Sequence, residues 1–346
     1  SFASSYGICT QDDAFISFRY AQNFIQGDGL VFNKGELVEG ISNPLWTLML
    51  AFGMSLLNFE PVFLSILMGI GSLIWLLWIS SELLEEYRLP QIGLYLLTID
   101  FSLILESVEG LESTFFAAVI AQIWLTLKRY DGTTGIRTIV LLFVIALLTR
   151  PESPLLILSF VIAFAVHNST YHRVISFQLL MSLCSSIIVI TSIRFLYYEE
   201  FFPNTFYAKV GGMAVERGIS YLLLFGKHHV LYGVCLIFLP YIINFRIKEY
   251  QEYTYLLIPF TLHIIYVLYI GGDFKPTSRF LLTLSSFFCI LSTLLIQRLY
   301  TKHRFEIIVV LILSSMYSRG LLWQKSQDWA KIRQQNFIAR RAAGLF

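Results

Sequence analysis

Two adjacent acids, Asp12 and Asp13, begin a polar segment in a chain that is otherwise rich in apolar runs. This segment extends to about residue 40 and holds five acidic residues against Arg19 and Lys34. Ionisable groups in or beside a bilayer are costly to keep, and they often mark functional sites. The pair therefore indicates chemistry at a membrane surface.

The residues around the pair follow a helical pattern. Thr10 stands three residues before Asp13, which is the spacing of a capping box. An apolar face then recurs at helical intervals, at Ala14, Phe18, Ala21 and Ile25. Gly27 marks the expected end. The pattern predicts a short amphipathic helix that lies on the membrane and begins at the two aspartates.

The sequence leaves two interpretations of the pair open. Acids in a first helical turn complement the positive end of the helix dipole, which is a structural role. Alternatively, one carboxylate acts as a general base within hydrogen-bond reach of a substrate. Neighbouring helical side chains point about 100° apart, so the two acids are expected to differ in role.

The composition is typical of an integral membrane protein. Of the 346 residues, 56% are hydrophobic and 14% are charged, whereas about a quarter are charged in soluble domains. The net charge of +2 gives no sign of nucleic-acid binding. The four cysteines lie far apart and form no metal-ligand spacing, so we expect small buried apolar side chains. Clustered acids permit a divalent metal without demanding one.

Apolar runs recur along the chain and predict many helical spans. They cover residues 43–58, 61–81, 92–105, 114–127, 136–149, 154–167, 177–198, 229–244, 254–270, 279–299 and 306–318. A span takes about twenty residues, and helices satisfy the backbone in lipid. The runs do not alternate as barrel strands do, so we predict about nine to eleven helical spans.

The loops give an expected orientation. Basic residues gather at 128–129, 246–248 and 298–304, which the positive-inside bias places in the cytoplasm. The acids of the first polar segment fit the opposite side. No signal peptide precedes that segment, and we expect a further membrane helix before it.

Further charged and polar residues stand where apolar runs end. They are Glu106, Glu109, Glu112, Arg150, Glu152, Asn204, Tyr207, Lys209, Asp273, Lys275 and Arg279. Each group alone fits an ordinary interfacial loop. Together they place acids beside bases at several boundaries, where Arg and Lys can hold a phosphate. Asp100 and Arg194 are single charges near run ends, which either snorkelling or a partner explains.

These segments, taken in order, resemble a known family. They are Asp12–Ala21, Gly29–Asn33, Glu39–Trp46, Gly110–Glu112, Leu148–Glu152, Pro203–Lys209 and Gly271–Phe274 with Arg279–Phe280. The pattern resembles the bacterial GT-C glycosyltransferases related to the mycobacterial terminal arabinofuranosyltransferase, over nearly the whole chain.

The resemblance implies an all-α integral membrane protein, a polytopic GT-C-type helical bundle with surface helices in its first extracytoplasmic loop. It implies inverting transfer of a sugar, arabinofuranose or another pentose or hexose, from a polyprenyl-phosphate donor. The acceptor would be a cell-envelope glycan or glycolipid, such as arabinan or lipopolysaccharide. The reaction would occur at the extracytoplasmic face of the bacterial inner membrane and would require no cofactor.

The resemblance also assigns roles. Asp12 or Asp13 would be the general base, with Asp13 slightly favoured, and the other would position a substrate. Glu109, Glu112 and Glu152 would line the sugar pocket. Arg150, Lys209, Lys275 and Arg279 would be candidates for the donor phosphate, and Asp273 would orient one of these bases. The remaining substrate-binding candidates are Arg19, Glu39, Asn43, Asn204 and Tyr207.

The predicted organisation is a transmembrane catalytic domain over residues 1–320, with its catalytic loop at 12–42, and a polar basic tail over 321–346 that begins a further region. The expected partners are the bilayer, the lipid-linked donor and the acceptor, with no nucleic acid. The oligomeric state is left open. A transporter or flippase of a lipid-linked sugar is the alternative, but a transporter is expected to show repeats and mid-membrane charges.

Overall fold

The computed structural model describes residues 10–131, 135–166, 170–204, 214–237, 253–273, 275, 277–300 and 320. These residues are helical with no strand among them, which confirms the all-α class. The predicted tail at 321–346 lies outside this part of the chain, as do Tyr207 and Lys209.

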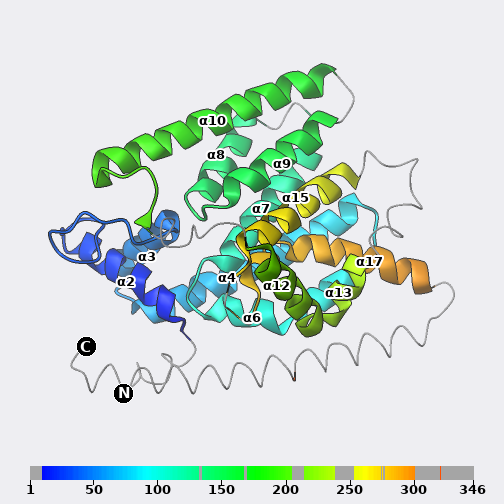
Figure 1. The fold of residues 1–346 in the computed structure, drawn as a ribbon, viewed down its shortest axis with the longest axis horizontal. Helices are drawn as coiled ribbons and strands as arrows, with labels where there is room; N and C mark the ends of the chain where they lie inside the picture. The colour runs from blue at the N-terminus through cyan, green and yellow to red at the C-terminus, as the bar shows by residue number, and fades with distance from the viewer. Residues whose placement is uncertain are drawn as a thin grey trace.

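Figure 1 shows the helices in chain order from blue to orange. They are α2 (Asp12–Ile25), α3 (Pro44–Leu57), α4 (Pro61–Glu86), α5 (Ile92–Thr98), α6 (Phe101–Val108), α7 (Ser113–Lys128), α8 (Ile136–Leu147), α9 (Ser153–Val166), α10 (Thr170–Tyr198), α12 (Val215–His228), α13 (Val230–Ile237), α15 (Thr254–Ile270), α16 (Arg279–Leu282) and α17 (Ser285–Tyr300).

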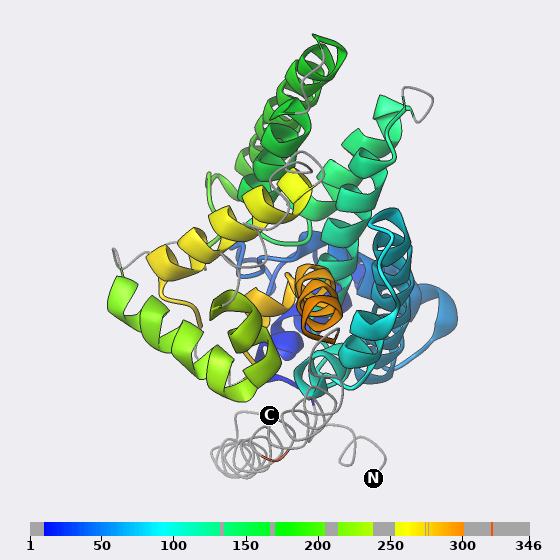
Figure 2. The same ribbon diagram turned by 90° about the vertical axis from the view of Figure 1, so that its right-hand side faces the viewer.

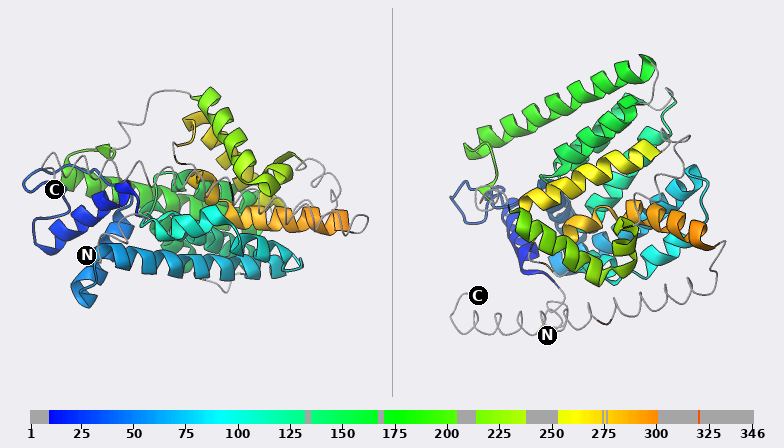
Figure 3. Two further views of the ribbon diagram at one scale, coloured as in Figure 1. Left: turned by 90° about the horizontal axis from the view of Figure 1, so that it is seen from below. Right: turned by 45° about the vertical axis from the view of Figure 1, so that its right-hand side comes forward.

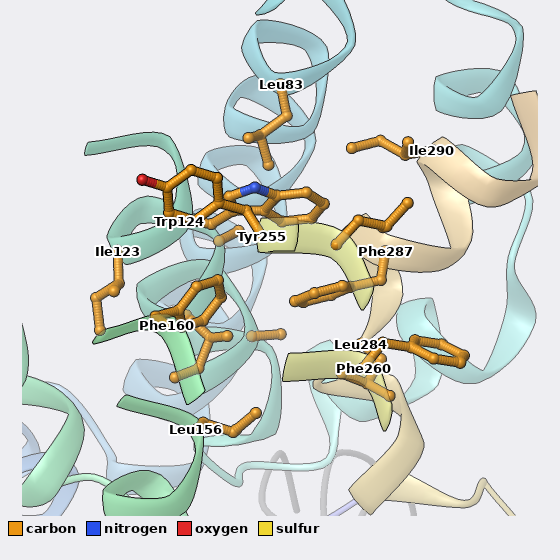
Figure 4. Close-up of a cluster of buried hydrophobic side chains, with 14 of the residues drawn as sticks. Leu83, Ile123, Trp124, Leu156, Phe160, Tyr255, Phe260, Leu284, Phe287 and Ile290 are labelled. Carbon is orange, nitrogen blue, oxygen red and sulfur yellow. The ribbon is translucent and has the colours of Figure 1, made fainter. Parts of the chain in front are cut away.

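Helix α17 lies in the middle of the bundle. Figure 2 shows it end-on, with the other helices arranged around it. Its side chains from Ser285 to Ile296 are buried. This agrees with the sequence of the helix, which has no charged residue until Arg298. The core beside it is aromatic: the ring of Trp124 on α7 stacks on that of Phe287 on α17 at 4.4 Å, with Phe160 and Phe260 close by (Figure 4).

The outer helices cover different faces of this core. Helix α4 lies on one face, and α12 lies on the opposite one (Figure 3). Helix α10 runs along an edge beside α8 and α9, and its C-terminal end lies near the α2–α3 region (Figure 1). Most of the large apolar side chains on the outer face of α10 are exposed, among them Phe177, Ile188 and Leu196. Such a face suits lipid contact.

The prediction of nine to eleven spans in a polytopic GT-C-type bundle is not borne out by the described residues. In the described part of the chain, α4 and residues His172–Tyr198 of α10 are long and apolar enough to cross a bilayer. Helices α6 and α7 together make a third candidate, bent by 114°. The other apolar helices have 10–17 residues. At 1.5 Å per residue, a 17-residue helix covers only about 26 Å of a hydrocarbon core of about 30 Å.

The breaks have local causes. The run at 92–105 is divided at Asp100, which caps α6 by accepting hydrogen bonds from the backbone N–H groups of Ser102 and Leu103. The turn from α6 to α7 passes through Gly110, which has φ of +88°. Only glycine adopts that conformation readily. Gly69 of α4 then lets α6 approach closely, because a Cβ there would collide with the carbonyl oxygen of Ser107.

The first helix begins where the sequence predicted. Helix α2 starts at Asp12, and Gly27 follows its end with φ of +84°. The predicted apolar face is buried at Ala14, Phe18 and Ala21, although Ile25 is exposed. The predicted capping box is wrong: the N-cap is Gln11, and no side chain caps the helix.

Candidate functional site

Four helix boundaries meet at one group of charged side chains. They are the start of α2, the α6–α7 turn, the α8–α9 turn and the α15–α16 loop. Backbone hydrogen bonds hold the first of these in place, since Gln11 N donates to the carbonyl oxygen of Glu109 at 2.9 Å. Leu45 N, in the first turn of α3, donates to the carbonyl oxygen of Leu148 at the same distance. We call the group the charge cluster; its members are Asp13, Glu106, Glu109, Glu112, Arg150, Glu152, Asp273, Lys275 and Arg279.

Lys275 connects the α15–α16 loop to α6. Its Nζ lies 3.2 Å from Glu106 Oε1 and 3.0 Å from Glu109 Oε2, and all three side chains are buried. Thr277 donates a second hydrogen bond to Glu106 Oε1 at 2.5 Å. The two acids lie at the C-terminal end of α6, where the helix dipole disfavours negative charge. The lysine supplies the compensating charge.

Arg150 joins the turn between α8 and α9 to the start of α7. Its Nη1 lies 3.2 Å from Glu112 Oε1, and its Nε donates to Glu152 Oε1 at 2.5 Å. Its guanidinium also lies 5.2 Å from the centre of the Phe280 ring. Burial disfavours the charged guanidinium, but the charges of Glu152 and Glu112 outweigh it and raise the pKa of Arg150 above its usual range.

Arg279 is the cation of the charge cluster that pairs with Asp13. Its Nε lies 2.5 Å from Asp273 Oδ2 without the alignment of a hydrogen bond, so this contact is an ion pair only. Its Nη1 lies 3.7 Å from Asp13 Oδ2. The side chain of Asp13 is 45% exposed, whereas that of Arg279 is 8% exposed. Burial raises the pKa of Asp273 against the opposing charges of Arg279 and Lys275.

The two predicted catalytic acids differ in their surroundings. Asp12 is exposed, and it forms no ion pair with any residue that the structure describes. Asp13 is half-buried and contacts the charge cluster through Arg279. The two acids therefore differ in exposure and in contacts.

The charge cluster holds more acids than bases. Six carboxylates, including Asp13, surround the three cations Arg150, Lys275 and Arg279. The N-terminal ends of three helices lie at the cluster: α2 at Asp12, α7 after its N-cap Glu112, and α9 directly after Glu152. Each such end carries about half a positive charge, which offsets part of the negative excess.

Asn43 connects the cluster to α2. Its Nδ2 donates to Glu112 Oε2 at 2.6 Å, and its Oδ1 accepts from Ser17 at 3.1 Å and from Thr47 at 3.3 Å. All four side chains are buried. Because Ser17 lies one helical turn after Asp13, this contact fixes the part of α2 that carries the acid.

Three other predicted site residues make their contacts elsewhere. Glu39 pairs with Arg194 of α10, with 2.6 Å between Oε2 and Nε, and its carbonyl oxygen accepts from Asn204 N at 2.9 Å. Burial raises the pKa of Glu39 against the charge of Arg194. Arg19 is exposed and donates to the carbonyl oxygen of Phe32 at 3.3 Å. These residues fix the 28–40 loop to α2 and α10.

The sequence placed Glu106 at a helix boundary but assigned it no role in the site. It belongs to the network because it lies three residues before Glu109, and that spacing was the available signal. No pattern pointed to Ser17 or Thr277. Asp100 also has a partner, since its Oδ2 lies 3.4 Å from His229 Nδ1.

The described residues were also compared with the ligand sets of metal sites. Among the described residues, no group of three or more His, Cys, Asp or Glu side chains could hold a metal ion.

Comparisons with known proteins add no assignment. No protein-family model, no curated protein and no solved structure matches the chain. The chemistry of the charge cluster therefore rests on its own geometry and on the sequence pattern.

Proposed function

We propose that the protein is an inverting glycosyltransferase that moves a sugar from a polyprenyl-phosphate donor to a cell-envelope glycan or glycolipid. The observation that carries this proposal is the position of Asp13. Its half-exposed carboxylate stands at the rim of the charge cluster, 3.7 Å from Arg279. A general base must be reachable by a substrate, and a departing phosphate needs a cation close to that base.

In this reaction, Asp13 takes the proton of an acceptor hydroxyl as the hydroxyl oxygen attacks the anomeric carbon. The bond between that carbon and the phosphate oxygen breaks, and polyprenyl phosphate leaves as an anion. Attack from the opposite side inverts the anomeric configuration. Asp12, which is exposed, serves as a first-turn acid that favours the N-terminal end of α2.

The buried part of the cluster suits a sugar. Glu152 keeps one buried oxygen, Oε2, that has no hydrogen-bond partner among the described residues. Buried acceptors favour a ligand that brings donors, and sugar hydroxyl groups do so. Glu112 shares Arg150 with Glu152, and Glu109 is held by Lys275 in the same charge cluster.

The membrane setting supports a lipid-linked donor. The two long apolar helices make membrane association plausible. Helices α7 and α8 each have one end at the charge cluster, and their other ends carry Lys128, Arg129 and Arg137. The positive-inside bias places the basic ends in the cytoplasm. We therefore propose an enzyme of the bacterial inner membrane whose site faces the extracytoplasmic side.

The test uses purified protein with synthetic polyprenyl-phosphate pentoses and hexoses and candidate envelope acceptors. The expected result is sugar transfer that Asp13→Asn abolishes and Asp12→Asn largely retains. Transfer that survives Asp13→Asn would reject the general base. Movement of the lipid across a vesicle membrane without any transfer would instead support a flippase.

A further inference from the structure

The contact between Asp13 and Arg279 bears on how the donor phosphate enters the charge cluster. This inference rests on the proposed function, because it concerns the same site. We propose that a phosphate anion binds Arg279 by displacing the Asp13 carboxylate, so that donor binding releases the general base. The ion pair at 3.7 Å would then be the state in which the base is held.

Of the three cations in the cluster, Arg279 has the partner that is easiest to exchange. Lys275 and Arg150 each lie between two buried carboxylates. Removing either cation from its partners would leave buried charges unpaired, which is strongly unfavourable. Asp13, by contrast, has a half-exposed side chain that can turn into water. Ion pairs with such exposure are weak because water screens them.

The two carboxylates beside Arg279 lie at different atoms of its guanidinium. Asp273 lies beside Nε of Arg279, and Asp13 lies beside Nη1. A guanidinium offers five N–H donors in a planar fork that matches phosphate oxygens. Asp273 can therefore stay in place and hold the arginine while a phosphate takes the position of Asp13.

The exchange also links the two halves of the reaction. A sugar phosphodiester carries about one negative charge, and the leaving phosphate monoester carries about 1.5 to 2. The attraction of Arg279 for the phosphate therefore increases as the bond to the sugar breaks. At the same time, the proton that Asp13 takes from the acceptor neutralises the carboxylate that competes for Arg279.

The test measures binding of geranylgeranyl phosphate to the full chain in detergent micelles, by calorimetry or thermophoresis. Asp13→Asn is expected to bind this lipid about threefold to fivefold more tightly than the unchanged protein, because the competing carboxylate is gone. Asp12→Asn is the matched control, since it removes the same charge one residue away. It is expected to stay within about twofold of the unchanged protein. An affinity of Asp13→Asn that equals or falls below that of Asp12→Asn would overturn the exchange.

Further binding measurements test which part of the lipid is recognised and whether Arg279 is the cation that binds it. Geranylgeraniol, which lacks the phosphate, is expected to show no gain with Asp13→Asn, and a gain would contradict the role of the phosphate. Inorganic phosphate tests whether the headgroup alone is sufficient; a gain with it assigns the site to free phosphate as well as to lipid phosphate. Arg279→Lys keeps the charge and is expected to lose part of the gain when combined with Asp13→Asn.

The result is separable from the proposed function. If Asp13→Asn binds the lipid phosphate more tightly but the unchanged protein transfers no sugar, the exchange stands and the enzyme assignment fails. If transfer occurs and depends on Asp13 but binding shows no gain, the enzyme assignment stands and the exchange fails.

Discussion

The same chemical group, an arginine between two glutamates, lies beside each of the two ends of helix α7. At its N-terminal end, Arg150 pairs with Glu112 and Glu152; at its C-terminal end, Arg129 pairs with Glu82 and Glu86. The distances are similar, at 2.5–3.2 Å in the first group and 2.5–2.8 Å in the second. The side chain of Arg150 is 7% exposed, whereas that of Arg129 is 41% exposed.

This difference in exposure decides what each group contributes. Water screens the exposed group, so its ion pairs add little to stability. The buried group depends on every partner, because removal of one leaves a charge without compensation. The buried group can also hold a ligand in fixed geometry, which suits a binding site. The comparison leads to four predictions.

The largest effect is expected at Arg150. Arg150→Gln removes the positive charge between two buried carboxylates, and we expect a loss of about 3–5 kcal/mol in the free energy of unfolding. The measurement is thermal unfolding in detergent micelles. Arg129→Gln is the matched control, with an expected loss below about 1 kcal/mol. Equal losses at both arginines would show that burial does not separate the two groups.

A second buried group on α6 tests whether the same rule holds away from the charge cluster. Asp100 faces His229 through Oδ2 and caps α6 through Oδ1, and His229 Nε2 lies 3.1 Å from Ser102 Oγ. Asp100→Asn removes the charge from these contacts, with an expected loss of about 1.5–3 kcal/mol. Ser102→Ala removes only the hydroxyl contact and should cost less. A larger loss for Ser102→Ala would contradict this order.

Asn43 allows buried and exposed hydrogen bonds to be compared for an uncharged side chain. Asn43→Ala leaves Glu112 Oε2 without its amide donor in a buried position, and we expect a loss of about 1–3 kcal/mol. Asn33 makes a similar bond to Glu36 at 2.9 Å, but this pair is exposed. Asn33→Ala is therefore expected to change stability by less than about 0.5 kcal/mol. Unfolding midpoints of the two variants in one buffer give the comparison.

The smallest effect concerns salt. At low ionic strength, Arg129→Gln should lower stability by about 0.2–1 kcal/mol, and this loss should disappear near 1 M salt, where the screening length falls to about 3 Å. The loss at Arg150 should persist, because buried pairs are screened much less. A salt-independent loss at Arg129 would mean that its side chain stabilises the protein by packing rather than by charge.

Local patterns in the sequence predicted the parts of the fold that depend on near neighbours. The start of α2 at Asp12 and its end before Gly27 follow from helical spacing and a glycine with positive φ. The burial of Ala14, Phe18 and Ala21 follows from the same periodicity. The number of spans could not be predicted in this way, because an apolar run in the sequence does not show where a helix ends within it. Asp100 divides the run at 92–105 by capping α6, and Gly110 turns the chain between that run and the next one at 114–127.

The candidate site shows the same division. The sequence placed Glu109, Glu112, Arg150, Glu152, Asp273, Lys275 and Arg279 at helix boundaries, and the structure brings them into one cluster with Asp13. The sequence also predicted Glu39, Asn204 and Arg19 as residues of the same site. In the structure, these three residues make their contacts in the 28–40 loop and with Arg194. Residues at separate boundaries carry no sequence signal of which partner each one takes.

The sequence by itself determined that this is a helical membrane-type chain whose charges gather at helix ends, because composition and periodicity are properties of the chain alone. Only the tertiary structure decided that Asp13, not Asp12, reaches Arg279, and that Arg150 is buried while Arg129 is exposed. The physical reason is that burial and charge pairing are set by which helix ends meet in space. That meeting depends on packing between segments far apart in the chain.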